Sequence, residues 1–142
     1  MLSEKILKMP KIDLHCHLDG SLTVQSVKTV LERNVSYEDL RADEQCTSLS
    51  QYLKKFDLPL SCLQTPEAIR YCAKEFLLHL QKDHVQYIEV RFAPQLSTMQ
   101  GLSCAAVMEA VLEGLEDAKK VCGIHYGVIA CMMRHHSEEQ NV

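Results

Sequence analysis

The chain has 142 residues, of which 46% are hydrophobic and 24% charged, so residues 1–142 are predicted to form one globular domain with its own core. The formal net charge is −4, from 15 basic and 19 acidic residues, which argues against the cationic surface that nucleic-acid binding requires. The N-terminal segment MLSEKILKMP contains no apolar run long enough for a signal peptide or a membrane span.

The cysteine content indicates a reducing compartment. The seven cysteines are an odd number, spread from Cys16 to Cys131, and include no Cys-x-x-Cys pair. This spacing favours free thiols over a disulfide framework, which predicts a cytoplasmic protein. With the acidic net charge, it favours a small or neutral molecule as the partner, and neither nucleic acid nor a membrane.

A strand is predicted near the start of the chain. Residues 11–16 alternate in polarity with the period of two that a strand requires. The alternation assigns two faces, one with Ile12, Leu14 and Cys16 and the other with Asp13, His15 and His17. Gly20 then ends the pattern.

Helical periodicity follows this strand. Residues 23–33 and 49–56 carry apolar side chains at helical spacing, and the segment between them is predicted to be irregular. A longer helix is predicted to run from Pro66 to about Leu80. Thr65 can cap it, proline suits the first turn, and Glu67 lies near the positive end of its dipole.

Two more strands flank a further helix. Residues 85–94 (VQYIEVRFAP) combine β-branched and aromatic side chains and end in proline, which is typical of a strand. Residues 124–133 (IHYGVIACMM) are apolar on both faces, as in a parallel strand covered by helices. Between the two, Ser103 can cap a helix that Gly123 would end.

The predicted order βαβαβ indicates an α/β fold with a parallel sheet, right-handed crossovers and helices packed outside. Functional residues are expected at the carboxyl ends of the strands. Residues 137–140 match a capping box, yet only two residues follow, so the fold is expected to be incomplete as given. Three parallel strands leave two unpaired edges, which predicts either a fragment or a homo-oligomer that pairs these edges.

Two histidines stand at the end of the first predicted strand, in the sequence KIDLHCHLDG of residues 11–20. Residues two apart in a strand project to one face with Cα atoms roughly 6–7 Å apart, so the His15 and His17 rings can converge on one ion. Zinc binds neutral imidazoles, and a catalytic zinc usually has three protein ligands and an open position. An arbitrary His-x-His pair is more often structural, so the residues alone leave both interpretations open.

The sequence KIDLHCHLDGSL, residues 11–22, resembles the opening motif of adenosine deaminases. The resemblance continues in LKKFD (53–57), IEVRFAP (88–94) and CMMRHH (131–136), and so spans essentially the whole chain. Related amidohydrolases share the His-x-His pair, which alone would identify only a superfamily of metal hydrolases. Asp19 narrows the assignment, because relatives that act on adenine carry glutamate at this place.

The resemblance implies a zinc cofactor with His15 and His17 as ligands. It also implies that His17 lies against a purine nucleoside and that Asp19 accepts a hydrogen bond from the 5′ hydroxyl of the sugar. Leu53 and Phe56 would form part of a hydrophobic lip over the pocket, although their spacing suits an ordinary core equally well.

The implied fold is a (β/α)8 TIM barrel, to which this chain would supply the first three β/α units. The implied reaction is hydrolytic deamination of adenosine and deoxyadenosine to inosine (or deoxyinosine) and ammonia, in which zinc activates water. The third zinc histidine and the general acid of the family have no match here, so no catalytic residue is assigned and the isolated chain is predicted to be inactive. Glu89 and Arg91, which share a strand face, are expected to neutralise each other inside the barrel.

Two alternatives stay open. One is a deaminase of another aminopurine, which would carry similar motifs. The other is a non-catalytic protein that oligomerises through its sheet edges and whose histidines are structural.

Overall fold

A three-stranded parallel sheet forms the centre of the computed structural model, which describes residues 3–42 and 44–141. Met1, Leu2, Asp43 and Val142 lie outside the described residues. The strands β1 (Lys11–His17), β2 (Val85–Phe92) and β3 (His125–Ala130) lie side by side in that order. The predicted α/β fold with a parallel sheet is confirmed.

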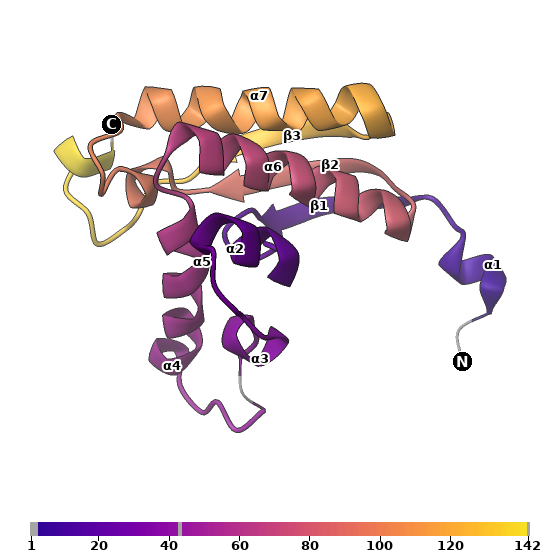
Figure 1. The fold of residues 1–142 in the computed structure, drawn as a ribbon, viewed down its shortest axis with the longest axis horizontal. Coiled ribbons are helices and arrows are strands. Elements are labelled where there is room, and N and C mark those ends of the chain that lie inside the picture. The colour runs from indigo at the N-terminus through magenta and orange to yellow at the C-terminus, as the bar shows by residue number, and fades with distance from the viewer. Residues whose placement is uncertain (1–2, 43, 142) are drawn as a thin grey trace.

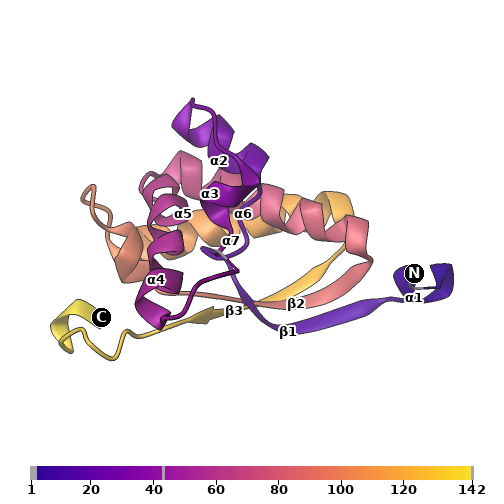
Figure 2. The same cartoon turned by 90° about the horizontal axis from the view of Figure 1, so that it is seen from below.

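Two long helices, α6 (Pro66–Leu80) and α7 (Cys104–Cys122), run along the sheet (Figure 1). Figure 2 shows that the helices gather on one face of the sheet and leave the opposite face uncovered. The expectation that β3 is covered on both faces is therefore wrong for the described chain. Its six residues are all intermediate or exposed.

The other elements are short. Helices α1 (Glu4–Leu7), α2 (Val24–Leu31), α3 (Tyr37–Leu40), α4 (Leu49–Leu53) and α5 (Asp57–Cys62) all precede α6. The 3₁₀ turns are η1 (Lys54–Phe56), η2 (Gln81–Asp83), η3 (Pro94–Ser97) and η4 (Glu139–Asn141). The stretch expected to be irregular contains α3, which a reciprocal capping box between Ser36 and Asp39 begins. No helix in the described part of the chain is long and apolar enough to cross a membrane.

The predicted ends of the long helices are confirmed. The Thr65 hydroxyl accepts a hydrogen bond from the Ala68 amide at 3.3 Å, and Pro66 takes the first helical position of α6. Ser103 caps α7 in the same way. Gly123 ends α7 in the left-handed conformation, with φ of 72°, and its amide donates to the Lys119 carbonyl.

The core lies between the helices and the covered face of the sheet. On β2, Ile88, Val90 and Phe92 are buried, whereas the alternate residues Tyr87, Glu89 and Arg91 are only partly buried. This alternation is that of a strand with one face on a core and one face open.

The alternation predicted for β1 is interrupted by an extra residue. Asp13 is the partner of Ile88 and Cys16 that of Val90, so three steps along β1 match two along β2. Because partner residues in a sheet share a face, Asp13 and Cys16 both lie on the helix side, and His17 lies on the open side. The predicted grouping of Asp13 with His17 on one face is therefore wrong.

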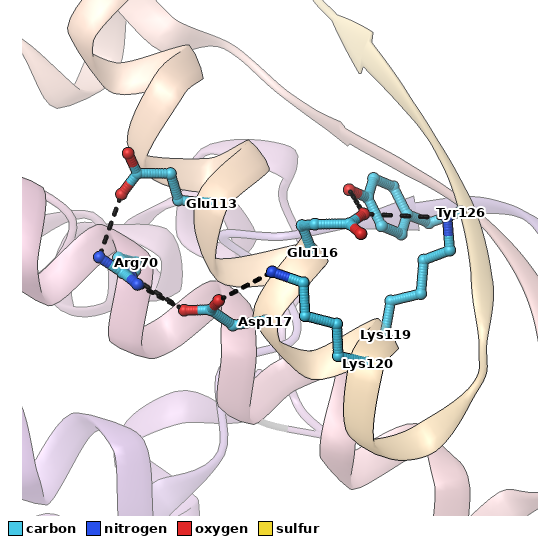
Figure 3. A network of polar contacts seen from close by, with 7 residues as sticks. All are labelled: Arg70, Glu113, Glu116, Asp117, Lys119, Lys120 and Tyr126. Carbon is cyan, nitrogen blue, oxygen red and sulfur yellow. Dashed lines mark hydrogen bonds and ion pairs between the residues drawn. The ribbon is translucent and has the colours of Figure 1, made fainter.

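A polar network joins the outer sides of α6 and α7 (Figure 3). Arg70 on α6 pairs with Asp117 at 2.6 Å and with Glu113 at 3.2 Å on α7. Ion pairs between such exposed groups contribute little to stability. Gly114 lies at the helix contact, where a Cβ atom would stand 2.3 Å from the Arg70 carbonyl oxygen. Close packing at this glycine, more than the ion pairs, therefore sets the distance between the helices.

Candidate active site

The carboxyl ends of the three strands lie at the same end of the sheet, beside α4, α5 and the C-terminal segment (Figure 1). A cavity of about 490 Å³ opens there. Its walls come from the turn after β1, from the α4–α5 region, and from the segments that follow β2 and β3. This is the place where parallel α/β folds carry their functional residues.

His15 and His17 lie next to each other, with ring centroids 5.3 Å apart and ring planes tilted by 34°. His17 lines the cavity, and its side chain is 47% exposed. Neutral imidazoles on one side of a strand end suit a zinc ion as part of its ligand set. Within residues 3–42 and 44–141, no group of three or more His, Cys, Asp or Glu side chains could hold a metal ion.

Arg91 and Glu89 do not form the pair that the sequence predicted. The Arg91 guanidinium turns to His15, with Nη1 at 3.1 Å from Nδ1 of the ring. Glu89 instead accepts a hydrogen bond from the Tyr87 hydroxyl, which raises the pKa of that tyrosine. Tyr87 lies two residues before Glu89 on β2, and His15 lies on the neighbouring strand β1.

Asp19 is a buried carboxylate on the cavity wall. It is 7% exposed, and its Oδ1 atom has no hydrogen-bond partner among the described residues. The His17 ring lies beside it, with Nδ1 at 3.7 Å from Oδ1, and carries charge only when protonated. Burial raises the pKa of Asp19, and the neighbouring His17 opposes this shift. A polar ligand group in the cavity would satisfy the orphaned oxygen.

Leu53 and Phe56 also line the cavity, and Leu53 is 51% exposed. Their position is that of a rim and not of an ordinary core. Phe56 packs against the turn after β1, where a Cβ atom at Gly20 would lie 3.1 Å from its ring. Tyr52 meets the same ring edge to face at 5.6 Å between centroids. The rim therefore rests on the turn that carries Asp19.

Cys131 and Met133 are among the cavity residues that had not been assigned from the sequence. They directly follow β3, so the rule that places function at strand carboxyl ends could have indicated them. Arg134, His135 and His136, further along, are not among the residues that line this cavity.

Comparison with solved structures identifies the class of protein. An amidohydrolase from Burkholderia ambifaria, solved with bound zinc, matches 95% of this chain and 39% of its own, with a TM-score of 0.77 and 19% identity. The N6-methyl-AMP deaminase from Arabidopsis thaliana matches 96% of this chain and 44% of its own, with a TM-score of 0.71 and 26% identity. The fold is thus part of the barrel of amidohydrolase-type deaminases.

Sequence comparison identifies the family within this class. The adenosine deaminase family model matches residues 10–142, and the chain belongs to that family. The adenosine deaminase of Clostridium acetobutylicum is 38% identical over 151 aligned positions, which cover 99% of this chain and 45% of the relative. The chain therefore spans a little under half the length of the curated relatives that it matches.

Proposed function

We propose that this chain supplies the nucleoside-binding wall and two zinc ligands of an adenosine deaminase that converts adenosine and deoxyadenosine to inosine or deoxyinosine and ammonia. The observation that carries the proposal is the placement on one cavity, at the carboxyl end of β1, of His17 and of a buried Asp19 whose Oδ1 atom has no hydrogen-bond partner among the described residues. Family membership supports the reaction class. The other zinc ligands and the general acid would come from outside the described residues.

His15 and His17 would hold the zinc, since their donor atoms and their proximity suit it. When bound, zinc supplies the Lewis acidity that activates water at neutral pH. Asp19 would accept a hydrogen bond from the 5′ hydroxyl of the nucleoside through its free oxygen. Leu53 and Phe56 would cover the ligand and exclude bulk water, which strengthens that polar contact.

A deaminase of a nucleoside monophosphate is the competing proposal, because a structural relative is an N6-methyl-AMP deaminase. The carboxylate of Asp19 argues against it, since a 5′ phosphate beside a buried negative charge is repelled. The test is a substrate panel of adenosine, deoxyadenosine, adenine and AMP with the full-length gene product. Faster turnover of AMP than of adenosine would contradict the proposal.

The Asp19→Asn variant is expected to lower kcat/KM for adenosine about 10- to 100-fold, because an amide is a weaker acceptor than a carboxylate for the 5′ hydroxyl. Assays with 5′-deoxyadenosine, which lacks this hydroxyl, provide the matched control. The wild type should be less active on 5′-deoxyadenosine than on adenosine. For the Asp19→Asn variant, the difference in activity between the two substrates should be small. An equal fall on both substrates would mean that Asp19 does not contact the 5′ position.

The same variant should be more stable than the wild type at pH 7 in the presence of a chelator. The raised pKa of Asp19 means that folding favours its neutral acid. The contribution of Asp19 to the free energy of unfolding is therefore largest below the ordinary carboxyl pKa. It is lost as the pH rises through the raised pKa. Thermal unfolding should show a difference at pH 7 that shrinks below about pH 4.

A further inference from the structure

The side chain of Asn141 makes several hydrogen bonds to the segment that follows β3. Its Oδ1 accepts a hydrogen bond from the Met133 amide at 2.8 Å, and its Nδ2 donates to the Met133 carbonyl at 3.1 Å. One carboxamide thus binds both backbone groups of one residue, as a neighbouring strand would. Nδ2 also lies 3.2 Å from the Ser137 carbonyl oxygen.

Gln95, in the turn η3 after β2, extends this arrangement. Its Nε2 donates to Oδ1 of Asn141 at 2.9 Å and to the Cys131 carbonyl at 3.2 Å. The Cys131 amide in turn donates to the Phe92 carbonyl at 2.8 Å. Gln95 and Asn141, here called the amide clamp, therefore tie the exit of β3 to the exit of β2.

The clamp acts on residues that line the cavity. Cys131 and Met133 lie on the wall of the same 490 Å³ cavity as His17 and Asp19. The regular β3 ladder ends at Ala130 and is followed by the hydrogen bond from the Cys131 amide to Phe92, whereas the Met133 amide is bound by a side chain, that of Asn141. A thioether is a polarisable group that suits contact with a flat aromatic ring.

We propose that Gln95 and Asn141 are positioning residues, which hold Cys131 and Met133 as the wall of the cavity that contacts the purine nucleoside. The proposal rests on the function proposed above, since that function supplies the ligand. The clamp itself does not touch the ligand, and acts by fixing the backbone of residues 131–133. Loss of the clamp should therefore weaken nucleoside binding far more than it slows the reaction of bound nucleoside.

The test uses the full-length gene product with alkylation of individual cysteines by iodoacetamide, followed by peptide mass spectrometry. Cys131 reports on the wall, and Cys72 is the internal reference for unfolding. Cys72 is fully buried, and burial raises its pKa to about 12, so it stays unreactive while the protein is folded. Inosine is the ligand probe, and Glu139→Ala, at an exposed residue two positions before Asn141, is the matched control.

In the wild type, inosine should slow the alkylation of Cys131. Asn141→Ala should speed it about tenfold without inosine, because two hydrogen bonds to Met133 are lost. Cys72 should stay unreactive. The KM for adenosine should rise about tenfold while kcat changes less than about twofold. Glu139→Ala should behave as the wild type does.

Equal Cys131 rates in the wild type, Asn141→Ala and Glu139→Ala would overturn the proposal, as would a fall in kcat at unchanged KM. If Asn141→Ala makes Cys72 reactive, the milder Gln95→Ala decides by the same criteria. The two proposals fail separately. A wild type without deaminase activity rejects the proposed function, whereas an active wild type whose Asn141→Ala variant is unchanged rejects the clamp alone.

Discussion

Replacing His15 or His17 with alanine in the full-length gene product is expected to lower adenosine deamination about 1000-fold, the equivalent of ~4 kcal/mol in the barrier. The two rings lie 5.3 Å apart, and losing either removes one of a small number of zinc ligands. Zinc content after dialysis, measured by elemental analysis, should fall in parallel with activity.

His125→Ala is the matched control, because His125 begins β3 at the opposite end of the sheet from the cavity. It should retain both zinc and activity. For the polypeptide of residues 1–142 alone, we expect weak zinc binding. We also expect no deaminase activity above that of the His15→Ala variant of the same polypeptide. Either full zinc retention by His15→Ala, or activity of residues 1–142 above this variant, would show that the zinc assignment or the incomplete site is wrong.

The second large effect is expected at Gly114, where alanine should lower the free energy of unfolding by about 2–3 kcal/mol. The added Cβ would stand 2.3 Å from the Arg70 carbonyl oxygen and 2.9 Å from Cβ of Ala73, so α6 and α7 must move apart. Alanine gains ~1 kcal/mol in helix propensity, which offsets only part of this cost. Urea unfolding followed by circular dichroism measures the change.

Two control variants separate the cause of this loss. Gly123→Ala meets no atom within 4 Å but sits at a φ of +72°, so it should cost about 1 kcal/mol through backbone strain alone. Arg70→Met removes the ion pairs of Arg70 with Glu113 and Asp117 (Figure 3) and should cost little stability, because these groups are exposed. If Gly114→Ala is no worse than Arg70→Met, the close helix contact does not limit stability.

The sequence predicted the features that depend on local chemistry. Thr65 and Ser103 cap the two long helices as expected, because a hydroxyl one position before a helix binds amides only a few residues away. The parallel direction of the strands was predicted from the same helices. A helix connects each strand to the next, which is the connection that parallel strands need and hairpins lack. The position of His15 and His17 at a strand end was equally local.

What the sequence did not predict depends on contacts between distant segments. The extra residue in β1 appears only in its register against β2, which no pattern within β1 specifies. Arg91 contacts His15 of the neighbouring strand, so its partner could not be inferred from β2 alone. Cys131 and Met133 reach the cavity because Asn141 fixes the irregular backbone after β3, a contact that alternation and helical spacing do not encode.

The uncovered face of the sheet has a consequence for how β2 tolerates substitution. Residues at even positions, Ile88, Val90 and Phe92, are committed to packing, while the odd positions Tyr87, Glu89 and Arg91 carry polar groups that the core does not use. Within β2, packing and polar contacts are thus assigned to alternate residues: the odd positions bind Glu89 to Tyr87 and Arg91 to His15 on β1. A substitution at an odd position therefore changes the polar groups beside β1 and leaves the packed face of the strand as it is.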